Sequence, residues 1–172
     1  MKRAVAVGSL LTLLWGSRVA GAACLPIGDA DDPGCVPADN PTNRCESGVN
    51  DLMAKMASDL LKCHKKFIRA AFTGTAFDEE ACEASAIGKF DGKTPRFDPC
   101  PACLDLPTVR SQAEAFLDGT VNAMIFCAGS TPVGDDDAGF VPPNGTALNC
   151  ERTATGNAGV LAAGLLKCHY KS

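Results

Sequence analysis

Apolar residues recur at steps of three and four along residues 41–72, which is the pattern of an amphipathic helix. Asn40 and Pro41 are typical of a helix start, and Gly74 of a helix end. We therefore expect one long helix over 41–72. Its inward stripe would contain Val49, Leu52, Met53, Met56, Leu60, Cys63, Phe67 and Ala71.

A second helix is expected over 78–90, because acidic residues at 78–80 favour the positive end of a helix dipole. Its periodicity turns Ala84, Ile87 and Phe90 inward. The Gly- and Pro-containing residues 91–103 then predict a loop.

Two further helices are expected over 106–127 and 149–170, with a long loop between them at 129–148. The inward face of the third helix would contain Val109, Ala113, Phe116, Thr120, Met124 and Cys127. Asn149 would cap the fourth helix, in which three glycines each cost about 1 kcal/mol relative to alanine. No run shows the strict alternation of an amphipathic strand. The pattern thus predicts an all-α fold: a disulfide-stapled bundle of about four helices in a single domain, 41–172, after an irregular segment, 23–40.

The first 22 residues have the composition of a secretory signal peptide: a basic start, an apolar run and an Ala-x-Ala cleavage site ending at Ala22. Cleavage would leave 150 residues and move the formal net charge from −4 to −7, because it removes three basic residues and no acid. The apolar run is short for a membrane span. We expect a secreted or periplasmic protein without a membrane span, and its acidity argues against a nucleic-acid partner. Acylation of Cys24, as in a lipoprotein, is the alternative.

All ten cysteines lie beyond the predicted cleavage site. An even number of cysteines in an exported chain predicts a disulfide framework, here of five bonds. If consecutive helices are antiparallel, cysteines near adjoining helix ends can meet. The pairs predicted on this basis are Cys24–Cys35, Cys45–Cys100, Cys63–Cys82, Cys103–Cys168 and Cys127–Cys150. Exchanging Cys100 with Cys103 gives an alternative pattern.

The pentapeptide LLKCH occurs twice, at 60–64 and at 165–169. We interpret each copy as a point where a helix is joined to its neighbour by a disulfide, with His64 and His169 facing solvent. The alternative is a haem or metal site that uses both histidines, since helical bundles can hold such groups between facing helices. The Cys-x-x-Cys-His motif of covalent haem attachment is absent, so no cofactor is expected.

Two other motifs suggest chemistry. The Cys100-Pro-Ala-Cys103 motif resembles that of thiol oxidoreductases, which makes a thiol-redox protein a second alternative, although those motifs lie in a βαβ setting that is not visible here. The acidic run at 135–137 lacks the ligand spacing of an EF-hand loop and is expected to be a solvated tip. Structural half-cystines and a polar loop are the expected roles of these motifs.

The run LLKCHKK is followed by DEEAC, by KF, and by a cysteine and the helix PTVRSQAEAFLDG. Over residues 45–127 and 150–171 this order resembles uncharacterised exported Cys-rich bacterial proteins with recurring KCH motifs. The resemblance implies export and a bridged helical fold, and those proteins have no assigned activity. The resemblance adds nothing on function. Because the sequence has no Gly-x-Ser-x-Gly, His-Glu-x-x-His or phosphate-binding glycine loop, we expect a non-catalytic module that binds an unknown protein or a small apolar ligand.

Overall fold

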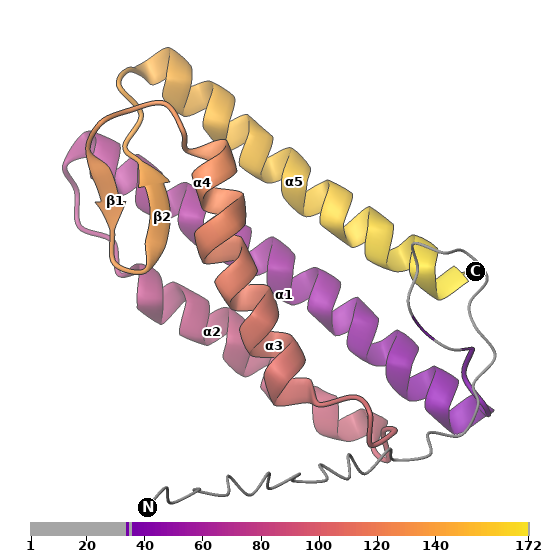
Figure 1. Cartoon of the computed structure of the whole chain (residues 1–172). Coiled ribbons are helices and arrows are strands. Elements are labelled where there is room, and N and C mark those ends of the chain that lie inside the picture. Colours follow the sequence, from indigo (N-terminus) through magenta and orange to yellow (C-terminus); the bar gives the residue numbers. More distant parts are fainter. Residues whose placement is uncertain (1–33, 35, 172) are drawn as a thin grey trace, which may run out of the picture. The chain divides into compact units, whose positions relative to one another are not determined.

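The computed structural model describes residue 34 and residues 36–171, and Pro37–Ser172 form one compact unit. The predicted signal peptide and the predicted Cys24–Cys35 pair lie outside the described residues. The unit is mostly helical, which confirms the all-α prediction (Figure 1). Its elements are α1 (Asn40–Thr73), α2 (Glu79–Asp91), the 3₁₀ turn η1 (Thr94–Phe97), α3 (Leu106–Ala115), the π-helical segment η2 (Phe116–Val121), α4 (Asn122–Ile125), β1 (Pro132–Gly134), β2 (Asp137–Phe140) and α5 (Gly145–Lys171).

The two predicted helix starts in the first half of the chain are capped by side chains. Asp39 accepts a hydrogen bond from the Thr42 amide at 2.8 Å, and Asp78 accepts one from the Ala81 amide at 2.9 Å. Such caps satisfy amide groups that have no partner inside the helix. α1 ends at Gly74, whose positive φ of 67° lets its amide close the last turn.

The long helix α1 packs against α2 on one side and, most extensively, against α5 on another (Figure 1). α1 and α5 are antiparallel, because Asn50 near the start of α1 donates to the carbonyl of Leu166 near the end of α5, whereas Gly159 lies against Ser58 and Leu61. The main core lies along α1 and comprises Cys45, Val49, Leu52, Met56, Ala57, Leu60, Leu61, Ala86, Phe90 and Leu117.

The third helix differs from the prediction because η2 interrupts it with a π-helical segment. A π turn adds a residue to each turn, so residues beyond it rotate relative to α-helical spacing. The inward residues are Leu117, Asp118 and Asn122, whereas the predicted inward residues Phe116 and Met124 are 56% and 73% exposed. The predicted face is confirmed at Ala113, which packs against the main core, and is wrong from Phe116 onward.

A short antiparallel hairpin, β1–β2, occupies part of the predicted long loop. Its strands have three and four residues, which is too few to show alternation in the sequence. Gly139 in β2 has φ 117°, and a Cβ there would lie 2.9 Å from the carbonyl oxygen of Phe126. The hairpin thus packs closely against the end of α4. α5 begins at Gly145, because Asn144, not Asn149, caps it by accepting from the Ala147 amide at 3.0 Å.

Two disulfides join α1 to the segment that follows it. Cys45–Cys100 joins the start of α1 to the residues after η1, and Cys63–Cys82 joins the second half of α1 to the first turn of α2. Both are pairs predicted from adjoining helix ends. The other predicted pairs, Cys103–Cys168 and Cys127–Cys150, are not formed, and these four cysteines are exposed and unbonded. The prediction treated the third and fourth helices as one hairpin, but α5 packs mainly on α1.

None of the helices among the described residues has both the length and the apolar character that a membrane span requires.

Candidate metal centre

His64 lies in the interior of the protein, with 0% of its surface exposed. The prediction of a solvent-facing His64 was wrong because α1 is covered by several elements, so its buried arc is wider than one apolar stripe. Leu61 and Ile68, on the same side of the helix, are also buried. An imidazole in this position must find polar partners within the protein.

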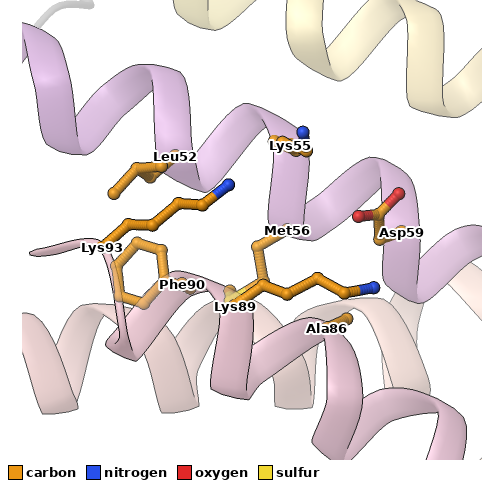
Figure 2. A pocket seen from close by; sticks show the side chains of 8 residues that line it. All are labelled: Leu52, Lys55, Met56, Asp59, Ala86, Lys89, Phe90 and Lys93. Atoms are coloured by element: carbon orange, nitrogen blue, oxygen red, sulfur yellow. The ribbon is translucent and has the colours of Figure 1, made fainter.

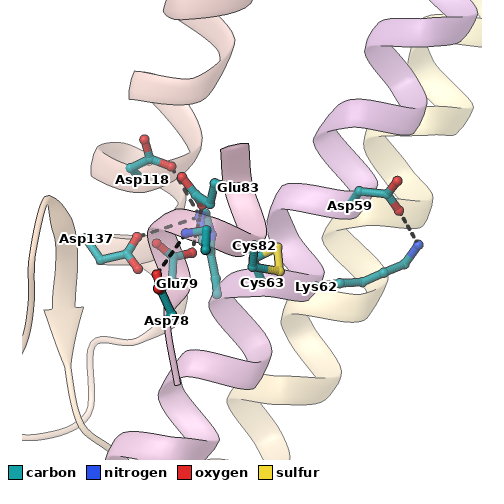
Figure 3. The surroundings of a disulfide bond; sticks show 11 residues. Asp59, Lys62, Cys63, Asp78, Glu79, Cys82, Glu83, Asp118 and Asp137 are labelled. Atoms are coloured by element: carbon teal, nitrogen blue, oxygen red, sulfur yellow. Dashed lines mark hydrogen bonds and ion pairs between the residues drawn. A yellow bond between two sulfur atoms is a disulfide. The ribbon is translucent and has the colours of Figure 1, made fainter. Parts of the chain in front are cut away.

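Four buried carboxylates from three other elements supply those partners. Glu79 and Glu83 come from the first turns of α2, Asp118 from η2 and Asp137 from β2. Their oxygens surround one atom, the Nε2 of His64: Glu83 Oε1 at 2.7 Å, Asp118 Oδ1 at 3.2 Å, Asp137 Oδ1 at 3.7 Å and Glu79 Oε1 at 3.8 Å. Figure 3 shows the four carboxylates converging beside the Cys63–Cys82 disulfide. We call these five residues the His64 centre.

The Cys63–Cys82 disulfide fixes the start of α2 on α1, and Cys63 directly precedes His64 in the sequence. Cys82 lies between Glu79 and Glu83, which are four residues apart and thus on one face of α2. The inward face of α2 therefore begins with two glutamates. The predicted inward residue Ala84 is exposed.

The other half of the centre is positioned by the π-helical segment and the hairpin. Asp118 lies in η2, and Asn122 follows one turn later with 0% exposure. The side-chain amide of Asn122 donates to Asp137 Oδ1 and so ties α4 to β2. The acidic run 135–137 was predicted to be a solvated tip, and this is wrong for one residue. Asp136 is exposed as predicted, but Asp137 is only 7% exposed.

The charges in the centre do not balance, because one imidazole faces four carboxylates. Burial lowers the pKa of His64, but the Asp118 and Glu83 hydrogen bonds and the Asp137 charge outweigh it and raise that pKa to about 10. Burial, with the neighbouring Glu83, raises the pKa of Glu79 to about 9. Burial also raises the pKa of Asp137 to about 7 and shifts that of Asp118 upward. The centre therefore strongly resists ionisation of all its acids.

Several buried polar atoms in the centre have no hydrogen-bond partner. They are His64 Nδ1, both carboxylate oxygens of Glu79, Asp137 Oδ2 and Asn122 Oδ1. A buried polar atom without a partner costs about 1–3 kcal/mol, so native proteins rarely keep several together unless a water, a ligand or an ion completes them. Glu79 is the clearest case, since it is 2% exposed and both its oxygens are unpartnered.

The distances from His64 Nε2 to the four carboxylates lie in the range found between ligands of a bound metal ion. Ligand atoms bound at about 2.1 Å lie about 3.0 Å apart at neighbouring octahedral positions and about 3.4 Å apart in a tetrahedron. The separations of His64 Nε2 from the four carboxylates run from 2.7 to 3.8 Å. Two sets of three, His64 with Asp118 and Asp137 and His64 with Glu79 and Glu83, have ligand atoms within 4.8 Å of one another. These residues fit a divalent cation.

The structure does not bring His64 and His169 together. His169 follows Leu166 on α5, and Leu166 lies beside Asn50, about four helical turns along α1 from His64. The backbone at this end of α5 thus lies far along α1 from His64, and the alternative site that uses both histidines stays a prediction. The two LLKCH copies also differ in their cysteines, because Cys63 is bonded and buried and Cys168 is exposed and unbonded.

The Cys-Pro-Ala-Cys motif does not form a redox pair in the structure. Cys100 is bonded to Cys45, and Cys103 is exposed and unbonded. The motif lies between η1 and α3 and has no βαβ unit around it.

A small pocket lies between α1 and α2 (Figure 2). Its lining is part apolar and part charged: Leu52, Lys55, Met56, Asp59, Ala86, Lys89, Phe90 and Lys93. It encloses about 220 Å³, including space open to solvent. Small-molecule sites are usually lined mainly by apolar groups, whereas four of these eight residues are charged. The pocket therefore gives little support to the expected apolar ligand.

Of the residues in the His64 centre, the sequence suggested His64 as a metal ligand in the alternative interpretation, and Asp137 only as part of the acidic run 135–137, which was expected to be solvated. The spacing of Glu79 and Glu83 around Cys82 was a usable signal, because a Cys63–Cys82 bond would place both acids next to His64. Asp118 and Asp137 gave no such signal, since their positions depend on the π-helical segment and the hairpin.

Comparison with known proteins assigns no family. No protein-family model, no curated protein and no solved structure matches the chain. The resemblance to exported KCH proteins stays a prediction, and functional inference rests on the geometry of the chain itself.

Proposed function

We propose that the protein binds a divalent metal ion at the His64 centre. The observation that carries the proposal is Glu79, a buried side chain with two unpartnered oxygens among three other carboxylates and an imidazole. A cation would partner these oxygens and offset the repulsion between the acids. Without one, the fold would hold four acids and one imidazole in a dry site, which is a costly arrangement.

The donor set favours a first-row ion such as Mn²⁺, Fe²⁺ or Zn²⁺. Imidazole nitrogen suits Fe²⁺ and Zn²⁺, and carboxylate oxygen suits Mn²⁺. Thiolate ligands, which select Cu(I), are absent from the centre, because its nearest cysteine, Cys63, is in a disulfide. Ca²⁺ prefers ligands that are all oxygen.

Burial of the ligands supports binding, not turnover. His64, Glu79, Glu83, Asp118 and Asp137 are all at most 7% exposed. A catalytic metal site keeps a coordination position open to substrate, whereas a structural site is closed by protein ligands. We therefore propose a structural or metal-sequestering role, without catalysis.

The proposed compartment is an oxidising one, secreted or periplasmic. The two disulfides support this, because such bonds persist mainly outside the reducing cytosol. The sequence-based expectation of an unknown protein partner stays open beside metal binding. The small pocket gives the apolar-ligand alternative less support.

Titration of the metal-free protein with Mn²⁺ and with Zn²⁺, followed by calorimetry, tests the proposal. Asp118→Asn removes one ligand charge with almost no change in shape, and we expect at least about tenfold weaker binding of the preferred ion. Asp51→Asn, an exposed change on α1, is the matched control and should bind as the wild type does. If neither ion binds the wild-type protein, or if Asp118→Asn binds equally well, the proposal is wrong.

A further inference from the structure

A second group of carboxylates adjoins the His64 centre on its solvent side. It comprises Glu79, Glu80 and Asp136, whose carboxylate oxygens lie within 4.8 Å of one another. Glu80 comes from the first turn of α2 and Asp136 from the turn between β1 and β2. Both are exposed, whereas Glu79 is buried. We call these three residues the rim group.

The rim group holds like charges together without a basic partner. Among the described residues, the ion pairs made by lysine or arginine are Lys62–Asp59 and Arg110–Asp91, and neither involves the rim group. Glu80 and Asp136 converge from two elements on the buried Glu79, and a cation between them would offset the repulsion of their charges.

Glu79 links the rim group to the His64 centre. It belongs to both groups, and both its oxygens lack a hydrogen-bond partner although the side chain is buried. A carboxylate has two oxygens and can ligate two ions at once, and ions in two-metal sites lie about 3.5–4 Å apart. One unpartnered oxygen would suffice for a single ion, but Glu79 has two.

This inference rests on the proposed function. We propose that Glu79 bridges the ion of the His64 centre and a second divalent cation, which Glu80 and Asp136 also bind. This outer site offers only carboxylate oxygens, so it suits hard ions such as Mn²⁺, Mg²⁺ or Ca²⁺. Three side chains leave coordination positions for water, so the outer ion exchanges with solvent more readily than the inner ion. The protein then carries two unlike cation sites that share one carboxylate.

The experiment counts Mn²⁺ bound to the folded, disulfide-bonded chain by native mass spectrometry and measures both affinities by calorimetry. Mn²⁺ serves as the probe because it accepts both imidazole and carboxylate ligands. We expect two Mn²⁺ per wild-type chain, with the second bound more weakly. Glu80→Gln with Asp136→Asn should bind one Mn²⁺, at an affinity within about threefold of the inner site of the wild type.

Glu46→Gln with Asp51→Asn removes the same two charges from the start of α1 and should retain two Mn²⁺. Both double variants change side chains outside the buried core, and circular dichroism checks that they remain folded. One Mn²⁺ in the wild type, or two in the rim variant, overturns the second site and leaves the inner site standing. A wild type that binds no Mn²⁺, Zn²⁺ or Fe²⁺ overturns both sites.

Discussion

At the scale of single residues, Asn122 shows how the candidate ligands are held in place. It is fully buried, and its amide group donates to Asp137 Oδ1 while its own oxygen has no partner. A residue that orients a metal ligand in this way typically changes metal affinity by about 10–100-fold when it is removed. Asn122 can therefore be tested separately from the ligands.

We expect Asn122→Ala to weaken binding of the preferred ion by about 10–100-fold, because Asp137 loses the group that orients it. Asn149→Ala, at an exposed position on α5, is the control and should leave affinity unchanged. Calorimetric titration measures both variants. An Asn122→Ala protein that is folded and binds the ion at wild-type affinity would show that Asn122 only fills space.

What the sequence could predict at this scale depended on local spacing. The stripe through Leu52, Met56 and Leu60 follows helical periodicity, and all three residues are buried. His64 lies off that stripe, and its burial comes from elements distant in the sequence. Periodicity assigns a polar residue next to the stripe to solvent unless those distant elements are known.

At the scale of elements, the two disulfides attach to α1 at different distances from the His64 centre. Cys63–Cys82 joins the residue before His64 to the residue before Glu83, whereas Cys45–Cys100 lies near the start of α1. The bonds span 19 and 55 residues of sequence separation. In the chain-entropy account, they stabilise the fold by about 3 and about 4 kcal/mol.

We expect both cysteine pairs to affect stability but only one to affect metal binding. Replacing Cys63 and Cys82 by alanine should lower the free energy of unfolding by about 3 kcal/mol and weaken metal binding, because α2 is no longer fixed beside His64. Replacing Cys45 and Cys100 should lower stability by about 4 kcal/mol with little change in affinity. Urea denaturation and calorimetry measure the two effects. Equal losses of affinity would mean that the bond next to His64 has no special role.

The start of α2 could be predicted because capping is local: the Asp78 side chain accepts from an amide three residues on. The start of α5 was predicted five residues too late, at Asn149, because Asn144 offers the same local signal. The π-helical segment η2 and the β1–β2 hairpin could not be predicted, since both depend on packing against α1 and α4. Asp118 and Asp137 lie in these two elements. The sequence therefore predicted the framework of the bundle but only one residue of the candidate site.

At the scale of the whole molecule, the His64 centre links folding to pH. In the metal-free fold the pKa of His64 is raised to about 10, that of Glu79 to about 9 and that of Asp137 to about 7. Each value lies above that of the unfolded chain, so the folded protein holds more protons. Stability must therefore fall as pH rises.

We expect the free energy of unfolding of the metal-free protein to decrease from about pH 5 to about pH 9. The stabilisation from protonated His64 is full below its unfolded pKa and is lost as pH rises through about 10. Glu79 and Asp137 add to the loss, because the unfolded chain ionises them at lower pH than the folded protein does. Urea denaturation in the presence of a chelator measures the trend. Asp137→Asn should make the slope shallower below about pH 7, and a wild-type stability that rises with pH would contradict the assignment.

The closure of the His64 centre has a consequence for the timing of metal uptake. With every inner ligand at most 7% exposed, an inner ion could leave only when the hairpin or the start of α2 opens. Its dissociation rate would then be limited by local unfolding, which also has to break the bonds between the ion and its ligands. Formation of the Cys63–Cys82 bond removes one of those openings, so a chain that oxidises before it meets its ion would load slowly. The order of disulfide formation and metal binding would thus decide what fraction of the folded molecules contains the ion.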